Sequence, residues 1–188
     1  MKRIGPLVVL TACALFEGRA EAQDENRDAP SSDSGLRWEL AGGGAYRTLF
    51  GLDMWGGDVT ARAGIQSHGA HSAVFGEGSY FRGSTAAGLT TDVISGGFRA
   101  ALMPIARFHF GGGAHIVYFD IGRATEGGSI STWGIGCSVF FGYDVFEWPI
   151  GNGPFDVFVE VRADAMSLDT FHNAATMWGP TMELGVRL

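Results

Sequence analysis

The chain has 188 residues, which is enough for one domain of ordinary size, and 30 of them are glycine. Each interior glycine costs a helix roughly 1 kcal/mol relative to alanine, so this composition argues against a helical protein. The formal net charge is −7 and the only lysine is Lys2, which excludes the basic stripe that nucleic-acid binding needs.

The beginning of the chain has the features of a secretory signal peptide. Lys2 and Arg3 supply a positive end, residues 4–16 are largely apolar, and Ala20-Glu21-Ala22 forms a small-x-small cleavage site. We therefore expect export, with residues 1–22 removed. No later segment approaches the roughly 20 continuous apolar residues that a membrane-spanning helix needs.

Cys13 leaves a second interpretation of this segment open. Leu10-Thr11-Ala12-Cys13 resembles a lipoprotein box, which would place a lipidated cysteine at the mature N-terminus. The short stretch before Cys13, the interrupting Pro6 and the conventional site that follows favour ordinary cleavage. With either form of processing Cys137 has no partner, so the sequence predicts no disulfide.

The rest of the chain divides into a polar lead-in and one all-β domain. Residues 23–35 are acidic and rich in Ser, Asp and Pro, and we expect them to be disordered. From Leu36 onward the hydrophobic pattern has a period of two, which is typical of strands with unlike faces. In 155–165, for example, the odd-numbered residues are apolar and the even-numbered ones are mostly charged. The predicted strands are 36–47, 55–67, 72–82, 90–102, 105–121, 129–147, 154–167 and 176–188.

The connections between these segments contain turn residues and differ in length. The tight ones lie near 67–71 and 103–104, and the longer ones lie near 48–54, 83–89, 122–128 and 168–175. Short turns at one rim and longer loops at the other are typical of outer-membrane barrels.

The polar face of the predicted strands is charged and nearly balanced. Arginine suits crowded pairing because its planar fork meets carboxylates bidentately, and a buried charge left unpaired costs several kcal/mol. We therefore expect these charges inside a narrow eight-stranded barrel, with the apolar face toward lipid. The expected structural network in the lumen consists of Arg37, Glu39, Asp58, Arg62, Arg99, Arg107, Asp144, Glu160, Arg162, Asp164, Glu183 and Arg187. Arg47, Glu77, Asp156, His109 and His115 are assigned to the same face.

Two further features accompany this pattern. The tryptophans lie near inferred strand ends, where aromatic girdles sit in membrane barrels: Trp38, Trp55, Trp133, Trp148 and Trp178. The chain ends in Gly185-Val186-Arg187-Leu188, and Met182 and Leu184 lie on the same face of the last predicted strand as Val186 and Leu188. This ending is similar to the signal read by the barrel-assembly machinery.

On these features residues 36–188 resemble the small eight-stranded outer-membrane barrels, the OmpA-, OmpX- and OmpW-like barrels. Their members usually end in phenylalanine, whereas this chain ends in Leu188. The resemblance implies a closed antiparallel up-and-down transmembrane β-barrel in the outer membrane. It also implies that membrane lipids and the barrel-assembly machinery are partners. We expect a monomer without a cofactor.

No catalytic, cofactor-binding or metal-binding constellation stands out. His68 and His71 form an H-x-x-H in a predicted turn without a third ligand nearby. Ser167, Asp169 and His172 supply nucleophile, acid and base types, which leaves a lipid-modifying hydrolase open. The His-x-Ser pattern of the lipid A deacylase barrels is absent.

The sequence therefore favours a non-enzymatic envelope protein with a structural or surface-interaction role. Eight strands leave no wide aqueous channel, so a general porin is disfavoured. The main alternative is a soluble exported ligand-binding barrel similar to lipocalins, with its apolar face inward. The lipid hydrolase is a further alternative.

Overall fold

The computed structural model describes residues 34–67, 71–105, 107–123, 128–150, 153–169 and 174–188. The predicted signal peptide and nearly all of the predicted lead-in lie outside these residues. The strands are β1 (Ser34–Leu49), β2 (Leu52–Ser67), β3 (Ser72–Thr85), β4 (Leu89–Ile105), β5 (Phe108–Arg123), β6 (Ser129–Ile150), β7 (Gly153–Asp169) and β8 (Ala174–Arg187). Among the described residues there is no helix with the length and hydropathy of a membrane span.

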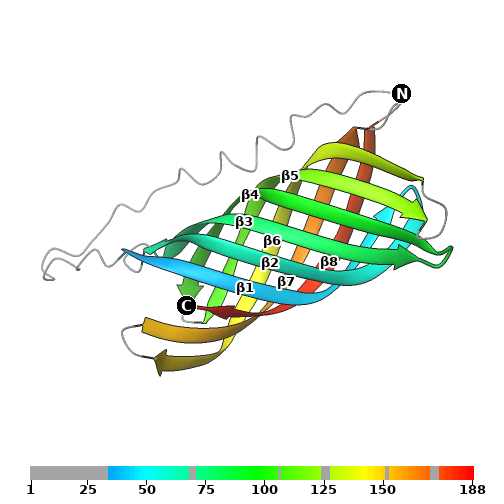
Figure 1. Ribbon diagram of the computed structural model, residues 1–188. Coiled ribbons are helices and arrows are strands. Elements are labelled where there is room, and N and C mark those ends of the chain that lie inside the picture. The colour runs from blue at the N-terminus through cyan, green and yellow to red at the C-terminus, as the bar shows by residue number, and fades with distance from the viewer. Residues whose placement is uncertain (1–33, 68–70, 106, 124–127, 151–152, 170–173) are drawn as a thin grey trace, which may run out of the picture. The chain divides into compact units, whose positions relative to one another are not determined.

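The eight strands form one closed barrel in sequence order (Figure 1). Each strand pairs antiparallel with the next, and β1 pairs with β8 in a register that sets Glu39 opposite Arg187. The prediction of a closed, eight-stranded, antiparallel up-and-down barrel is thus confirmed. Because the strand number is even, β1 begins and β8 ends at the same rim, which we call the terminal rim; the other is the distal rim.

The connections at the distal rim are shorter than predicted. Leu49 pairs with Leu52, so the connection expected at 48–54 is the two-residue turn Phe50-Gly51. Both residues have positive φ, 52° and 77°, as a type I′ hairpin turn requires. Likewise β3 continues to Thr85 and β4 starts at Leu89, within the connection expected at 83–89. The strands pair almost to their turns, so the expected contrast between short and long connections is weak.

Glycines let neighbouring backbones approach closely where the barrel closes. A Cβ on Gly43 would overlap the backbone carbonyl of Met182 in β8, and one on Gly179 would overlap the carbonyl of Tyr46 in β1. Gly44, the next residue, has open space around it. The seam between the first and last strands therefore depends on particular glycines rather than on glycine content in general.

The barrel interior is filled in layers. An apolar cluster closes the distal end, since Leu49 and Met54 flank the β1–β2 turn and Leu168 lies near the end of β7. A smaller cluster, Ala73, Phe75, Ala101 and Phe140, lies toward the terminal rim on the β3, β4 and β6 side. Charged side chains occupy the rest of the lumen. An eight-stranded barrel is just wide enough for side chains to fill it, and this one is filled.

Candidate functional site

The lumen holds a dense ionic network. Among the described residues six arginines and eight carboxylates point inward from the strands. Most of them are almost fully buried, and Glu160 and Arg62 expose at most 2% of their surface. The arginines are Arg37, Arg47, Arg62, Arg99, Arg162 and Arg187, and the acids are Glu39, Asp58, Glu77, Asp144, Asp156, Glu160, Asp164 and Glu183.

Glu160 of β7 and Arg62 of β2 form the centre of this network. The guanidinium of Arg62 lies 2.9 Å from Glu160, 2.7 Å from Glu77 and 2.8 Å from Glu183. Arg99 of β4 donates to both carboxylate oxygens of Glu160, at 2.9 and 2.6 Å. Each central charge thus meets several opposite charges, which offsets the desolvation that a buried ion pair costs.

A second set of contacts lies toward the distal rim around Arg162 and Arg47. Arg162 contacts Asp58, Asp164 and Glu183 at 3.0–3.1 Å. Arg47 pairs with Asp164 at 2.7 Å and also donates to the backbone carbonyls of Gly179 and Pro180. No Tyr46–Pro180 or Arg47–Gly179 pair appears in the β1–β8 ladder, so Arg47 supplies donors to β8 where the strand pairing is interrupted.

A third set reaches the terminal rim. Arg187 donates to Glu39 at 2.6 Å and lies 3.1 Å from Asp144. These residues come from β8, β1 and β6, so one guanidinium ties the closing strand to both sides of the lumen. Asp144 is the most exposed member of this set, at 20% for its side chain.

The structure places eleven of the twelve predicted network residues inside the barrel and one outside. Arg107 lies in the turn between β4 and β5, with φ at 80° and its side chain exposed. That assignment was wrong because β4 runs on to Ile105, so Arg107 precedes β5 instead of continuing its alternation. Arg37 is buried as expected.

One polar member was not singled out from the sequence. The hydroxyl of Thr60 lies 3.0 Å from Asp58 and 2.9 Å from Glu183, donates its one proton to either carboxylate, and is fully buried. Its position between Asp58 and Arg62 on the inward face of β2 could have identified it as a network member from the sequence. His109 lies 3.5 Å from Glu160, consistent with its assignment to the lumen.

The outer wall carries the apolar face. The five tryptophans are all between 55 and 69% exposed, and side chains such as Val139, Ile116 and Leu184 are also open on the outside. Aromatic rings gather in two bands. Tyr46–Trp55 and Tyr118–Trp133 pairs, with centroids 4.7 and 5.0 Å apart, lie toward the distal rim. Phe108–Tyr143 and Phe146–Trp148 pairs lie toward the terminal rim, at 4.8 and 5.7 Å.

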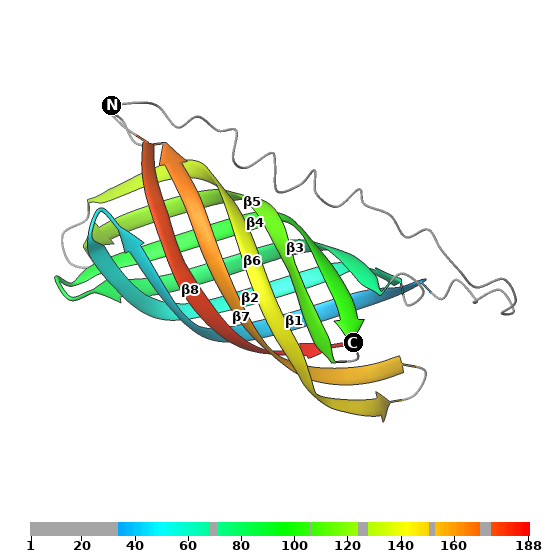
Figure 2. The same cartoon turned by 180° about the vertical axis from the view of Figure 1, so that it is seen from behind.

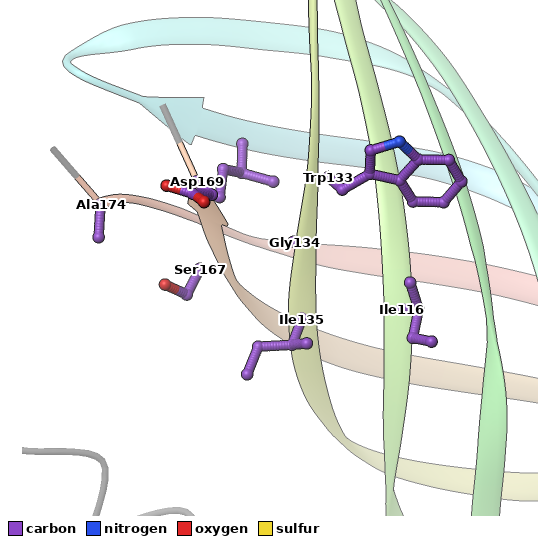
Figure 3. Close-up of a pocket in the computed structure, with 8 residues that line it drawn as sticks. Ile116, Trp133, Gly134, Ile135, Ser167, Asp169 and Ala174 are labelled. Carbon is purple, nitrogen blue, oxygen red and sulfur yellow. The ribbon is translucent and has the colours of Figure 1, made fainter. Parts of the chain in front are cut away.

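Two of the residues considered for hydrolysis lie on this outer wall. Ser167 and Asp169 are exposed on β7 and border a shallow groove of about 490 Å³ beside Trp133 and Ile135 (Figure 3). The third residue considered, His172, lies outside the described residues. The groove is mostly apolar, and its position on the wall separates it from the charged lumen.

The H-x-x-H motif gains no support as a metal site. His71 is exposed in the turn before β3, and His68 lies outside the described part of the chain. The residues that the structure describes contain no group of three or more His, Cys, Asp or Glu side chains placed to hold a metal ion.

The sequence itself matches nothing that would place it in a family. No protein-family model matches the chain, and no curated protein matches it either.

Solved structures do share the fold. Neisserial surface protein A superposes with a TM-score of 0.62 at 12% identity, covering 82% of this chain and 97% of that one. The N-terminal β-barrel domain of Pseudomonas aeruginosa OprF gives 0.52 at 13% identity, covering 81% and 97%. Ail, the attachment invasion locus protein of Yersinia pestis, gives 0.51 at 12% identity, covering 82% and 97%.

The chain therefore has the fold of the small eight-stranded outer-membrane β-barrels, as the sequence resemblance implied. The lipocalin-like alternative is wrong on orientation. It required an apolar interior around a ligand, whereas ionic groups fill the middle of this lumen and apolar side chains face outward.

Proposed function

We propose that this protein is a non-enzymatic barrel of the bacterial outer membrane with a structural or surface-interaction role. The observation that carries the proposal is the distribution of side chains between the two faces of the wall. Apolar residues cover the outside between two aromatic bands, while arginines and carboxylates pair within. This arrangement suits a hydrocarbon environment, in which the closed ladder satisfies backbone groups and charges avoid lipid.

The filled lumen favours a structural or surface role over transport. The apolar cluster at the distal end and the ionic network behind it place side chains across the lumen. The short connections between described strands also offer little area for a large adhesive surface.

Export to the outer membrane is part of the same proposal. The features of residues 1–22 support a cleaved signal peptide, and lipidation at Cys13 remains the alternative form of processing. Membrane lipids and the barrel-assembly machinery are the partners this location requires.

Fractionation and heat-modifiable migration test the proposal. The mature protein is expected in the outer-membrane fraction, to require detergent for extraction, and to change mobility on a detergent gel after boiling, because a closed hydrogen-bonded ladder resists unfolding in cold detergent. Recovery of the folded protein in a detergent-free periplasmic extract would contradict it.

An activity measurement addresses the hydrolase alternative. We expect intact phospholipid and lipid A after incubation with the refolded protein. Ser167→Ala is the matched variant: lipid hydrolysis by the original chain that this variant loses would overturn the non-enzymatic assignment.

A further inference from the structure

The hairpin formed by β6 and β7 extends past its neighbours at the terminal rim. The last residue of β6 paired with β5 is Tyr143, and the first residue of β7 paired with β8 is Asp156. Asp144 still donates its backbone N–H to the Arg107 carbonyl, and beyond these residues β6 and β7 pair only with each other, up to Ile150 and Gly153. Figures 1 and 2 both show this two-stranded ribbon, residues 145–150 and 153–155, standing clear of the other strands.

A β-bulge keeps the two faces of the ribbon distinct. The register shifts between Asp144 and Phe146, so Val145 is the extra residue. After the bulge Phe146 pairs with Val157 and Trp148 pairs with Phe155. These pairs lie on the same side as the outer wall, because Phe158, the neighbour of Val157, points fully inward.

The outward face of the ribbon is therefore aromatic and continues the wall of the barrel. Phe146 and Trp148 are 50 and 57% exposed, and their rings form an edge-on pair. On the opposite face Glu147 pairs with Asp156, so two acids lie side by side. One ribbon thus has an apolar face and an acidic one.

We propose that this ribbon is a membrane-interface anchor, whose aromatic face lies in the headgroup and upper acyl region of the leaflet next to the terminal rim. The inference rests on the proposed function, since it requires the barrel to span a bilayer. Its partner is a lipid surface, because the aromatic face is continuous with the lipid-facing wall and amphipathic rings of this kind favour the membrane interface.

Other occupants fit the ribbon less well. Pairing of another strand onto its edges is disfavoured because Pro149 and Pro154 provide no backbone N–H there. Burial of both faces within a protein partner is disfavoured by Glu147, which is exposed beside Asp156 and would lose its water there.

Depth-dependent fluorescence quenching tests the anchor. The mature chain would be refolded into phosphatidylcholine vesicles as two single-tryptophan variants, one retaining Trp148 and one retaining Trp133, with phenylalanine at the other tryptophan positions. Trp133, in the distal aromatic band, reports whether the barrel wall is in the bilayer. Lipids brominated near the headgroup are expected to quench both residues, and aqueous acrylamide is expected to quench Trp148 weakly.

Three other quenching results are possible, and each contradicts a different one of three statements: the anchor, the proposed function or the lipid assignment. Quenching of Trp133 by brominated lipid, with Trp148 quenched only by acrylamide, would remove the anchor and leave the barrel assignment intact. Absence of lipid quenching at both residues would remove the proposed function itself. Protection of Trp148 from acrylamide that disappears on dilution, without lipid quenching, would identify a second copy of the chain as the occupant and overturn the lipid assignment.

Variants with a single substitution control for misfolding of the single-tryptophan variants. Trp148→Phe in the otherwise unchanged protein should reduce the quenching by brominated lipid, as should the matched Trp133→Phe. If Trp148→Phe leaves that quenching unchanged while Trp133→Phe reduces it, the anchor is excluded.

Discussion

Arg99 and Glu160 meet across the lumen from β4 and β7, two strands that are not neighbours in the sheet. Both carboxylate oxygens of Glu160 accept from the Arg99 guanidinium, at 2.9 and 2.6 Å. The same guanidinium lies over the ring of Phe140, with its carbon 3.4 Å from the ring centroid. This contact links opposite sides of the cylinder through one side-chain pair.

A double-mutant cycle on this pair tests whether the network acts as a unit. We expect Glu160→Met alone to destabilise the barrel by about 3–5 kcal/mol, because it removes the buried carboxylate that Arg99 binds through both oxygens and that Arg62 also contacts. Combined with Arg99→Met, the cost should fall short of the sum of the single variants, with a coupling of about 0.5–3 kcal/mol. Urea unfolding in lipid vesicles measures these values. Glu147→Gln, at an exposed acid, is the control, and strictly additive costs would contradict a shared network.

Two adjacent glycines offer a matched test of the closing seam. Gly43→Ala should destabilise the barrel by about 1–3 kcal/mol, because its methyl group would overlap the Met182 carbonyl and push β8 away from β1. Gly44→Ala has open space around it and should cost nothing. The comparison uses the urea midpoint and the unboiled mobility on a detergent gel. Equal losses for both variants would mean that general backbone freedom, not the seam, determines the effect.

Arginine placed on the outer wall should report bilayer depth. Val139 pairs with Gly112 and Ala163 in the middle of the wall and is 64% exposed. Val139→Arg should cost about 2–4 kcal/mol in a bilayer, because a charge at the midplane is poorly solvated. Leu36→Arg, on the outward face near the start of β1 at the terminal rim, where Leu36 is 65% exposed, should cost about 0–1 kcal/mol. Similar costs at both positions in unfolding measurements would argue against a bilayer around the wall.

The filled lumen predicts that the protein does not conduct solutes. Vesicles containing the refolded barrel should not swell in small sugars, and planar bilayers should show no stable channel steps. Phe119→Ala removes part of the distal apolar cluster and should destabilise the protein by about 3–5 kcal/mol. It should nonetheless leave the vesicles closed, because the ionic network remains. Sugar uptake by the original protein would contradict a sealed interior.

The strand pattern could be predicted in detail where alternation is strict. In β7 the even-numbered residues 156–168 are buried along the whole strand, as the pattern of 155–165 indicated. Prediction failed where local rules change. Arg107 falls in a turn that the pattern did not locate, and the two-residue turn at Phe50 requires a positive φ that phenylalanine rarely adopts.

The sequence alone therefore determined the kind of structure: a period of two, one apolar face and nearly balanced charges specify a closed sheet with unlike sides. Only the tertiary structure decided which charges meet. Arg99 and Glu160 are 61 residues apart, and their contact depends on how far each strand is staggered against the next around the cylinder. Alternation along a strand records which side a residue faces, but the height at which it meets residues across the lumen is set by the register of all the strands together.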